Sequence, residues 1–177
     1  MNWPNRLTIF RIVLIPGFIV AIVYKKLEIA FIIFLIAAIT DALDGYIARV
    51  RNEKTKLGSI LDPIADKLLI TSAFITYSFL AEIPLNLKMP IYIPIIVVSR
   101  DIIILLGTMI IYLLFDNIDI KPTIIGKITT FFQMCTIIVI LLRFPYSKWI
   151  WNITAILTVI SGLNYVKIGT KYINERV

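Results

Sequence analysis

Four aspartates within a stretch of 26 residues are the part of the sequence best suited to chemistry. They form two pairs, Asp41 with Asp44 and Asp62 with Asp66, and each pair falls within an apolar run. Spacings of three and four residues place both members of a pair on one face of a helix. The short link between the two runs predicts antiparallel helices, which bring the pairs together. Four neighbouring carboxylates repel one another unless they are protonated or neutralised, and oxygen ligands of this kind suit Mg2+ or Mn2+.

The same aspartates also have structural interpretations. The segment from Ser59 to Asp62 could be a capping box at the start of a helix. Asp41 could form a buried ion pair with Arg49 or Lys67. Either interpretation accounts for one acid, whereas neither accounts for four acids on facing helices. Because ionisable groups within a membrane are costly and are functional by default, we expect a functional site.

The chain is too apolar for an ordinary water-soluble domain. Of its 177 residues, 59% are hydrophobic and 16% are charged, whereas soluble domains are about 25% charged. Six apolar runs are each long enough to cross most or all of a bilayer core of about 30 Å. The runs cover residues 7–24, 27–50, 59–81, 89–115, 123–142 and 149–166. We therefore expect one all-α integral membrane domain over residues 1–177, with six transmembrane helices and a first helix that is not cleaved.

The basic residues predict the orientation of this domain. The net charge is +7, and the positive side chains flank the apolar runs, which favours a membrane surface over nucleic acid as the partner. With the N-terminus in the cytoplasm, thirteen basic residues lie inside or within the spans and five lie outside. This predicts a cell-membrane protein with cytoplasmic N- and C-termini. Most charges within the runs then lie at cytoplasmic ends, so we expect a polar cavity open to the cytoplasm with its floor near Arg100.

Small and basic residues around the acids complete a longer pattern. Gly45, Ala48 and Gly58 could leave room for a bulky ligand or allow close helix packing. Arg49 suits a bidentate phosphate contact, or it anchors the cytoplasmic end of its helix. Together these residues read Asp41-x2-Asp44-Gly45-x2-Ala48-Arg49-x8-Gly58-x3-Asp62-x3-Asp66. This pattern resembles, at all eight positions, the signature of the CDP-alcohol phosphatidyltransferases.

The resemblance implies a metal-dependent membrane enzyme with six helices, usually a homodimer. Such an enzyme transfers a phosphatidyl group from a CDP-linked lipid to an alcohol and releases CMP. It implies two divalent cations, Mg2+ or Mn2+, one held by Asp41, Asp44 and Asp62 and the other by Asp41, Asp62 and Asp66. Asp66 would also accept the proton of the attacking hydroxyl, and the absence of histidine leaves a carboxylate as the base. The residues implied to line the CDP-lipid site are Asn5, Thr8, Gly45, Ala48, Arg49, Thr55 and Gly58.

The acceptor alcohol is indicated by residues before, around and after the signature. Asn5-x2-Thr8-x2-Arg11 and Leu61-Asp62-Pro63-x-Ala65-Asp66-Lys67 resemble the phosphatidylglycerophosphate synthase branch, whose acceptor is glycerol 3-phosphate. Arg100, Lys121 and Lys127 are cations able to hold its phosphate. The alternative for Arg100 is an ion pair with Asp101, although neighbours in sequence point to different faces of a helix.

Two other functions stay open from the sequence. Thr108 stands where many synthases of that branch carry a second arginine. Ser99-Arg100-Asp101 and Lys121-Pro122-Thr123-x3-Lys127-x2-Thr130-x2-Gln133 also resemble the CMP-forming cardiolipin synthases, which use phosphatidylglycerol as acceptor. Intramembrane acids can instead line an ion path, as in a transporter or channel. The outer halves of the first three runs are almost purely apolar, so we do not expect a continuous path.

Overall fold

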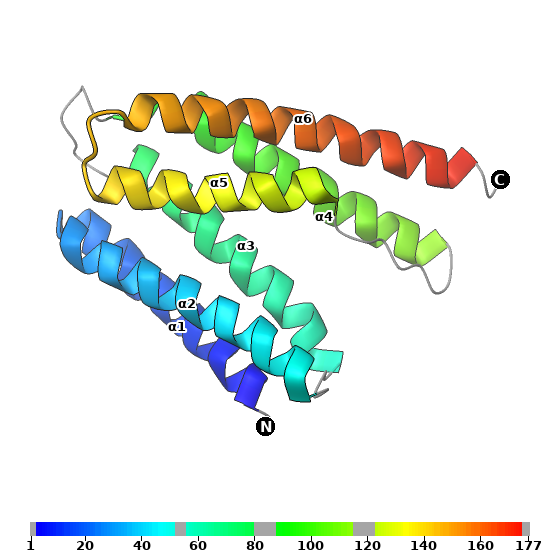
Figure 1. Cartoon of the computed structure of the whole chain (residues 1–177), viewed down its shortest axis with the longest axis horizontal. Coiled ribbons are helices and arrows are strands. Elements are labelled where there is room, and N and C mark those ends of the chain that lie inside the picture. The colour runs from blue at the N-terminus through cyan, green and yellow to red at the C-terminus, as the bar shows by residue number, and fades with distance from the viewer. Residues whose placement is uncertain (1–2, 52–55, 80–87, 115–122, 175–177) are drawn as a thin grey trace. The chain divides into compact units, whose positions relative to one another are not determined.

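The computed structural model describes residues 3–51, 56–79, 88–114 and 123–174. Within these ranges, the side chains at 3–6, 42, 44–51, 56–63, 112–114 and 172–174 are outside the description. The described residues form six helices (Figure 1). They are α1 (Trp3–Val23), α2 (Leu27–Arg51), α3 (Lys56–Phe79), α4 (Tyr92–Leu114), α5 (Ile124–Leu141) and α6 (Ser147–Asn174). The prediction of an all-helical fold is confirmed for these residues, and each apolar run corresponds to one helix.

Basic residues in the left-handed conformation end two of the helices. Lys25 has a φ of 61°, and the following amide, Lys26 N, donates to Ala21 O at the end of α1. Arg143 has a φ of 55°, and Phe144 N donates to Val139 O at the end of α5. Such bonds satisfy carbonyls that the helix itself leaves unpaired, and a cation there complements the negative end of the helix dipole. These ends make the tight turns from α1 to α2 and from α5 to α6.

The chain forms two compact units, and the acidic signature lies in the first. Unit 1 comprises residues 1–89 and 137–145, and unit 2 comprises residues 90–136 and 146–177. In unit 1, α1 packs against both α2 and α3, and Figure 1 shows α1 and α2 side by side in opposite directions. Phe18 of α1 and Phe34 of α2 meet with ring centres 5.9 Å apart, and both side chains are fully buried. This packing fixes the register of α1 against α2.

Unit 2 combines a packed pair of helices with a polar interface. Helices α4 and α6 pack against each other, and hydrogen bonds connect α5 with α6. Thr136 of α5 and Thr154 of α6 share a hydrogen bond of 2.7 Å between their hydroxyls, and both are fully buried. Thr129 also bonds to the Leu157 carbonyl across the same interface. Hydroxyls that bond across helices in this way are typical of membrane bundles.

Three of the described helices have the length and composition of membrane spans. They cover Tyr92–Ile111, Ile124–Leu141 and Ser147–Lys171, and α1 carries a shorter apolar segment, Leu7–Val23. Many large apolar side chains on these helices are exposed, including Val13 at 66% and Leu163 at 66%. Soluble monomers rarely expose apolar surface on this scale. The surface therefore fits contact with lipid, as the composition predicts.

Candidate active site

The first acid of the signature is held by an arginine from another helix. Asp41 lies on the same face of α2 as the buried Ala37, one turn further along the helix. Its Oδ1 lies 2.6 Å from Nη1 of Arg11 on α1. The Arg11 side chain is completely buried, whereas a third of the Asp41 side chain is exposed. Asp41 therefore has an ion-pair partner on another helix, Arg11, which the sequence alone did not suggest.

The other acids of the signature lie on the helices that the sequence predicted for them. Asp44 belongs to α2, and Asp62 and Asp66 belong to the first turns of α3. Asp66 is half-buried beside the fully buried Ala65. The side chains of Asp44 and Asp62 are outside the described set. The helical backbone confirms the spacing argument for each pair, because residues three or four apart share a helix face.

The residues expected at the CDP-lipid site are only partly described. Thr8 is fully buried on α1, one turn before Arg11 and on the same face. Asn5 lies on α1, Gly45, Ala48 and Arg49 lie on α2, and Gly58 lies on α3, but their side chains are outside the description. Thr55 falls outside the described residues altogether. The described backbone therefore assigns all of these except Thr55 to helices of unit 1.

Arg100 is buried in unit 2 and makes three contacts. Its Nη1 donates to Asp101 Oδ1 at 2.7 Å, and its Nη2 donates to Ser161 Oγ of α6, also at 2.7 Å. Its guanidinium carbon lies 5.6 Å from the centre of the Tyr165 ring, within the range of a cation–π interaction. The expectation that neighbours in sequence would not pair is wrong here. The long arginine side chain reaches back to the adjacent carboxylate.

Tyr165 connects Arg100 to the start of α5. Its Oη accepts a hydrogen bond of 3.3 Å from Thr123 N, and Thr123 Oγ1 accepts one of 3.0 Å from Gly126 N. Lys127 follows on the first turn of α5 and is exposed, whereas Lys121 lies outside the described residues. Sequence reasoning gave no role to Ser161 or Tyr165. Their spacing of four residues, which puts both on one face of α6, was the available signal.

Comparison with known proteins decides the family. The family model for CDP-alcohol phosphatidyltransferase matches residues 1–160. The chain belongs to the CDP-alcohol phosphatidyltransferase family. It is thus an enzyme of this class and a membrane protein, and the resemblance carried by the aspartate signature is confirmed.

Relatives of known function extend over nearly the whole chain. It is 31% identical to CDP-diacylglycerol–glycerol-3-phosphate 3-phosphatidyltransferase from Bacillus subtilis, covering 93% of each chain. It is 32% identical to the protein of the same name from Rickettsia felis, covering 97% of each chain. It is also 31% identical to human cardiolipin synthase (CMP-forming), covering 95% of this chain and 62% of the human protein.

The acids of this phosphatidyltransferase suit the divalent cations on which the family generally depends. Asp41 and Asp66 present half-buried carboxylates on α2 and α3, two helices that both pack against α1. Carboxylate oxygens are the ligands that Mg2+ and Mn2+ prefer. Among the side chains that the structure describes, no three potential ligands form a cluster, and Asp44 and Asp62 are not in that set. The carboxylates of Asp41 and Asp66 therefore fit such cations by their chemistry.

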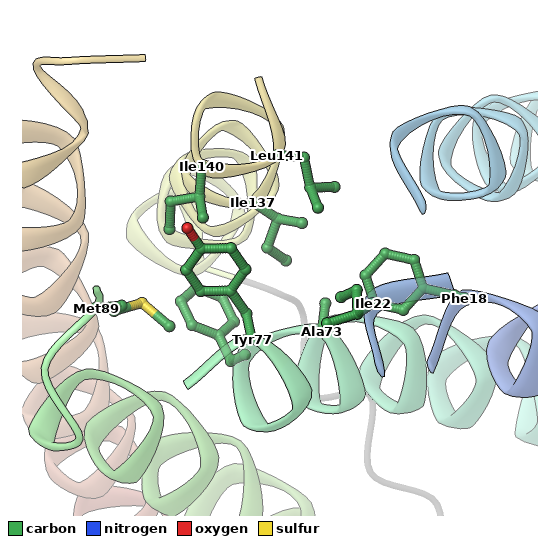
Figure 2. Close-up of a pocket in the computed structure, with 9 residues that line it drawn as sticks. Phe18, Ile22, Ala73, Tyr77, Met89, Ile137, Ile140 and Leu141 are labelled. Carbon is green, nitrogen blue, oxygen red and sulfur yellow. The ribbon is translucent and has the colours of Figure 1, made fainter. Parts of the chain in front are cut away.

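An apolar pocket in unit 1 lies away from these acids. Figure 2 shows it between Phe18 and Ile22 of α1, Tyr77 of α3, and Ile137 and Leu141 of α5. Its lining contains no charged residue. Tyr77 follows Asp66 by eleven positions on α3, which is roughly 16 Å along the helix axis. This pocket is therefore not the place where the phosphatidyltransferase signature would bind a diphosphate.

Proposed function

We propose that this enzyme transfers a phosphatidyl group from CDP-diacylglycerol to glycerol 3-phosphate, giving phosphatidylglycerophosphate and CMP. The observation that carries the proposal is the complete aspartate signature in a chain aligned over 93% of its length with a relative named for this reaction. The arrangement of Asp41 and Asp66 on two helices that share α1 as a neighbour supports it.

In the proposed reaction, a hydroxyl oxygen of glycerol 3-phosphate attacks the phosphorus that carries the diacylglycerol. The bond from that phosphorus to the bridging oxygen of CMP breaks, and CMP leaves with the bonding electrons. Asp66 accepts the proton of the attacking hydroxyl, a role that a carboxylate can perform without histidine. Bound divalent cations would neutralise the diphosphate and steady the attacking and leaving oxygens.

The proposed ligand sets follow the signature. Asp41, Asp44 and Asp62 hold one cation, and Asp41, Asp62 and Asp66 hold the other. The CDP-lipid is bound by seven residues from the N-terminal third of the chain. They are Asn5, Thr8, Gly45, Ala48, Arg49, Thr55 and Gly58.

Arg100, Lys121 and Lys127 are proposed to hold the phosphate of the acceptor. In the absence of substrate, one guanidinium nitrogen of Arg100 already donates a hydrogen bond to the Asp101 carboxylate. Fewer of its N–H groups are therefore available to a phosphate. A guanidinium has five N–H donors, so a phosphate can bind to it beside Asp101. Lys127 is exposed on the first turn of α5, near the positive end of the helix dipole, which favours an anion.

The proposed setting is the cell membrane. Six transmembrane helices place both termini and the active site on the cytoplasmic side, in a polar cavity that opens to the cytoplasm. The enzyme acts as a homodimer. Cysteine labelling from one side of sealed vesicles, at exposed sites such as position 127, tests the orientation, and native mass spectrometry of the purified protein tests the dimer.

A phosphatidylglycerol acceptor is the second candidate function. The human relative named cardiolipin synthase (CMP-forming), aligned over 95% of this chain, is the observation that favours it. The single experiment that separates the candidates supplies purified enzyme with CDP-diacylglycerol and Mg2+. Glycerol 3-phosphate and phosphatidylglycerol are added in separate reactions, and CMP release is measured. Faster release with glycerol 3-phosphate is expected, and faster release with phosphatidylglycerol contradicts the proposal.

Variants of the signature acids test the reaction class. Asp62→Asn and Asp66→Asn are expected to abolish CMP release while the protein stays monodisperse in detergent. Glu28→Gln is the matched control, because Glu28 is an exposed acid in the first turn of α2, away from the signature. Full activity in both Asn variants, or loss of activity in the control alone, contradicts the assignment of these residues.

A further inference from the structure

Arg11 is an unusual residue for its position in the fold. It lies in the apolar part of α1, and its side chain has no exposed surface. An arginine keeps its charge in a protein, so it is buried only where another group compensates that charge. Among the described side chains, the Asp41 carboxylate is a group that compensates it, with Arg11 Nη1 at 2.6 Å from Asp41 Oδ1. The most deeply buried cation of unit 1 among the described side chains is therefore attached to the first acid of the signature.

The exposure of the two partners is unequal, and this distinguishes the pair from a purely structural one. The side chains of Arg100 and Asp101 in unit 2 are both 6% exposed, so neither partner of that pair is accessible from the protein surface. In the Arg11–Asp41 pair the arginine is 0% exposed and the aspartate 33% exposed. The guanidinium holds the carboxylate from the protein side while leaving part of it accessible. A carboxylate has about four lone-pair positions, so it can accept a guanidinium hydrogen bond and bind a cation at the same time.

We propose that Arg11 is a positioning residue that orients the Asp41 carboxylate toward a divalent cation. The inference rests on the proposed function, in which Asp41 belongs to both ligand sets. Groups that hydrogen-bond to a metal ligand fix its orientation, and their loss weakens metal binding. Arginine suits this task because its planar guanidinium directs a carboxylate more rigidly than an ammonium does. Its place on α1, which packs against both α2 and α3, ties this orientation to the packing of unit 1.

The test is a Mn2+ titration of the purified full chain in detergent without substrate, followed by electron paramagnetic resonance or calorimetry. Arg11→Met removes the charge and the ion pair with Asp41 while keeping a long apolar side chain. We expect its Mn2+ affinity to fall about ten- to hundredfold. Arg11→Lys keeps the charge but not the guanidinium, so we expect a smaller, severalfold loss with near wild-type thermal stability.

The matched control is Gln133→Leu, which replaces a long, fully buried polar side chain of unit 2. Gln133 has no place in the proposed metal or substrate sites, and we expect the Mn2+ affinity of this variant to equal that of the wild type. A double-mutant cycle then shows whether Arg11 acts through Asp41. Once Asp41→Asn has removed the ligand, Arg11→Met is expected to cause no further loss of Mn2+ affinity.

Several results would overturn the inference. If Arg11→Met lowers the melting temperature but binds Mn2+ as tightly as the wild type, or more tightly, Arg11 is only structural. If Arg11→Met does not fold, Arg11→Lys decides, and unchanged Mn2+ affinity in that variant rejects the positioning role. An equal loss from Arg11→Met with and without Asp41 also rejects it. If the wild type itself binds no Mn2+, the metal part of the proposed function fails as well, which separates that failure from a failure of Arg11 alone.

Discussion

Arg100 donates a hydrogen bond of 2.7 Å to the carboxylate of Asp101, its neighbour in sequence, and both side chains are buried within unit 2. Ser161 of α6 accepts a second bond from the same guanidinium, which ties α4 to α6. Breaking a buried ion pair by removing one partner leaves an uncompensated charge, whereas replacing both partners removes the charges together. The two kinds of substitution therefore have different consequences for stability.

Arg100→Met alone is expected to lower the free energy of unfolding by about 3–5 kcal/mol, because it removes one partner of a buried ion pair and keeps the charge of the other. Arg100→Met/Asp101→Asn is expected to recover most of that loss. Both values are measured by SDS titration of the protein in mild detergent, followed by circular dichroism. A double variant less stable than Arg100→Met would show that Asp101 makes a favourable contact of its own.

The sequence predicted the helices closely, because apolar runs of membrane length directly reflect the bilayer. The run 27–50 corresponds to α2 (Leu27–Arg51), and the run 123–142 corresponds to α5 (Ile124–Leu141). The fourth run, 89–115, begins before its helix does, because Met89 and Pro90 are apolar but precede the first turn of α4. Hydropathy registers apolar residues whether or not their backbone is helical.

The partners of the buried charges could not be predicted in the same way. The sequence suggested Arg49 or Lys67 as a partner for Asp41, whereas the structure pairs Asp41 with Arg11 of α1. That pair depends on the register of α1 against α2, which is set by contacts such as Phe18 with Phe34. The Arg100–Asp101 pair depends on side-chain conformation, which a helical wheel ignores. The signature identified the family, because its spacing can be recognised without knowledge of tertiary packing.

Gly126 is expected to tolerate no larger side chain, because Tyr165 fills the space beside it. A Cβ at this position would lie 3.0 Å from Tyr165 Oη and 3.1 Å from Thr123 Oγ1. Gly126→Ala is therefore expected to lower the free energy of unfolding by about 1–3 kcal/mol, as overpacking does. The measurement is the same SDS titration, and the loss is expected to be smaller in a Tyr165→Phe background, which lacks Oη.

Gly107 provides the matched control for this prediction. It also lies within a helix of unit 2, but a Cβ there would meet nothing within 4 Å. Gly107→Ala is expected to be neutral or to stabilise the protein by up to about 1 kcal/mol, because alanine favours the helix over glycine. Equal losses from the two alanine variants would mean that the contact with Tyr165 does not limit position 126.

The hydroxyl pair of Thr136 and Thr154 is expected to contribute only modestly to stability. The two Oγ1 atoms are 2.7 Å apart, and each hydroxyl also lies within hydrogen-bond distance of the Phe132 carbonyl. Thr136→Val keeps the shape of the side chain and removes its hydroxyl. We expect a loss of roughly 0.6 kcal/mol, the average for such bonds in membrane proteins. A loss several times larger in SDS titration would indicate that the hydroxyls hold a wider network.

Gln133 presents the opposite case, a buried polar group without a hydrogen-bond partner among the described residues. Its side chain is fully buried in α5, and within the described parts of the chain neither atom of its amide has a hydrogen-bond partner. Thr129 and Thr136 lie on the same face of α5, but their hydroxyls donate to the Ile125 and Phe132 carbonyls. Each hydroxyl has one proton to donate, so neither can donate to the Gln133 oxygen at the same time.

Gln133→Leu is therefore expected to raise the free energy of unfolding by about 1–3 kcal/mol, the cost of a buried polar group without a hydrogen bond. Leucine is similar in size, so the gain comes from removing the amide and not from filling space. SDS titration and the melting temperature in detergent measure the change, with Thr136→Val as the control that removes a partnered group from the same face. A Gln133→Leu variant less stable than the wild type would show that the amide is hydrogen-bonded in the folded protein, for instance to a buried water molecule.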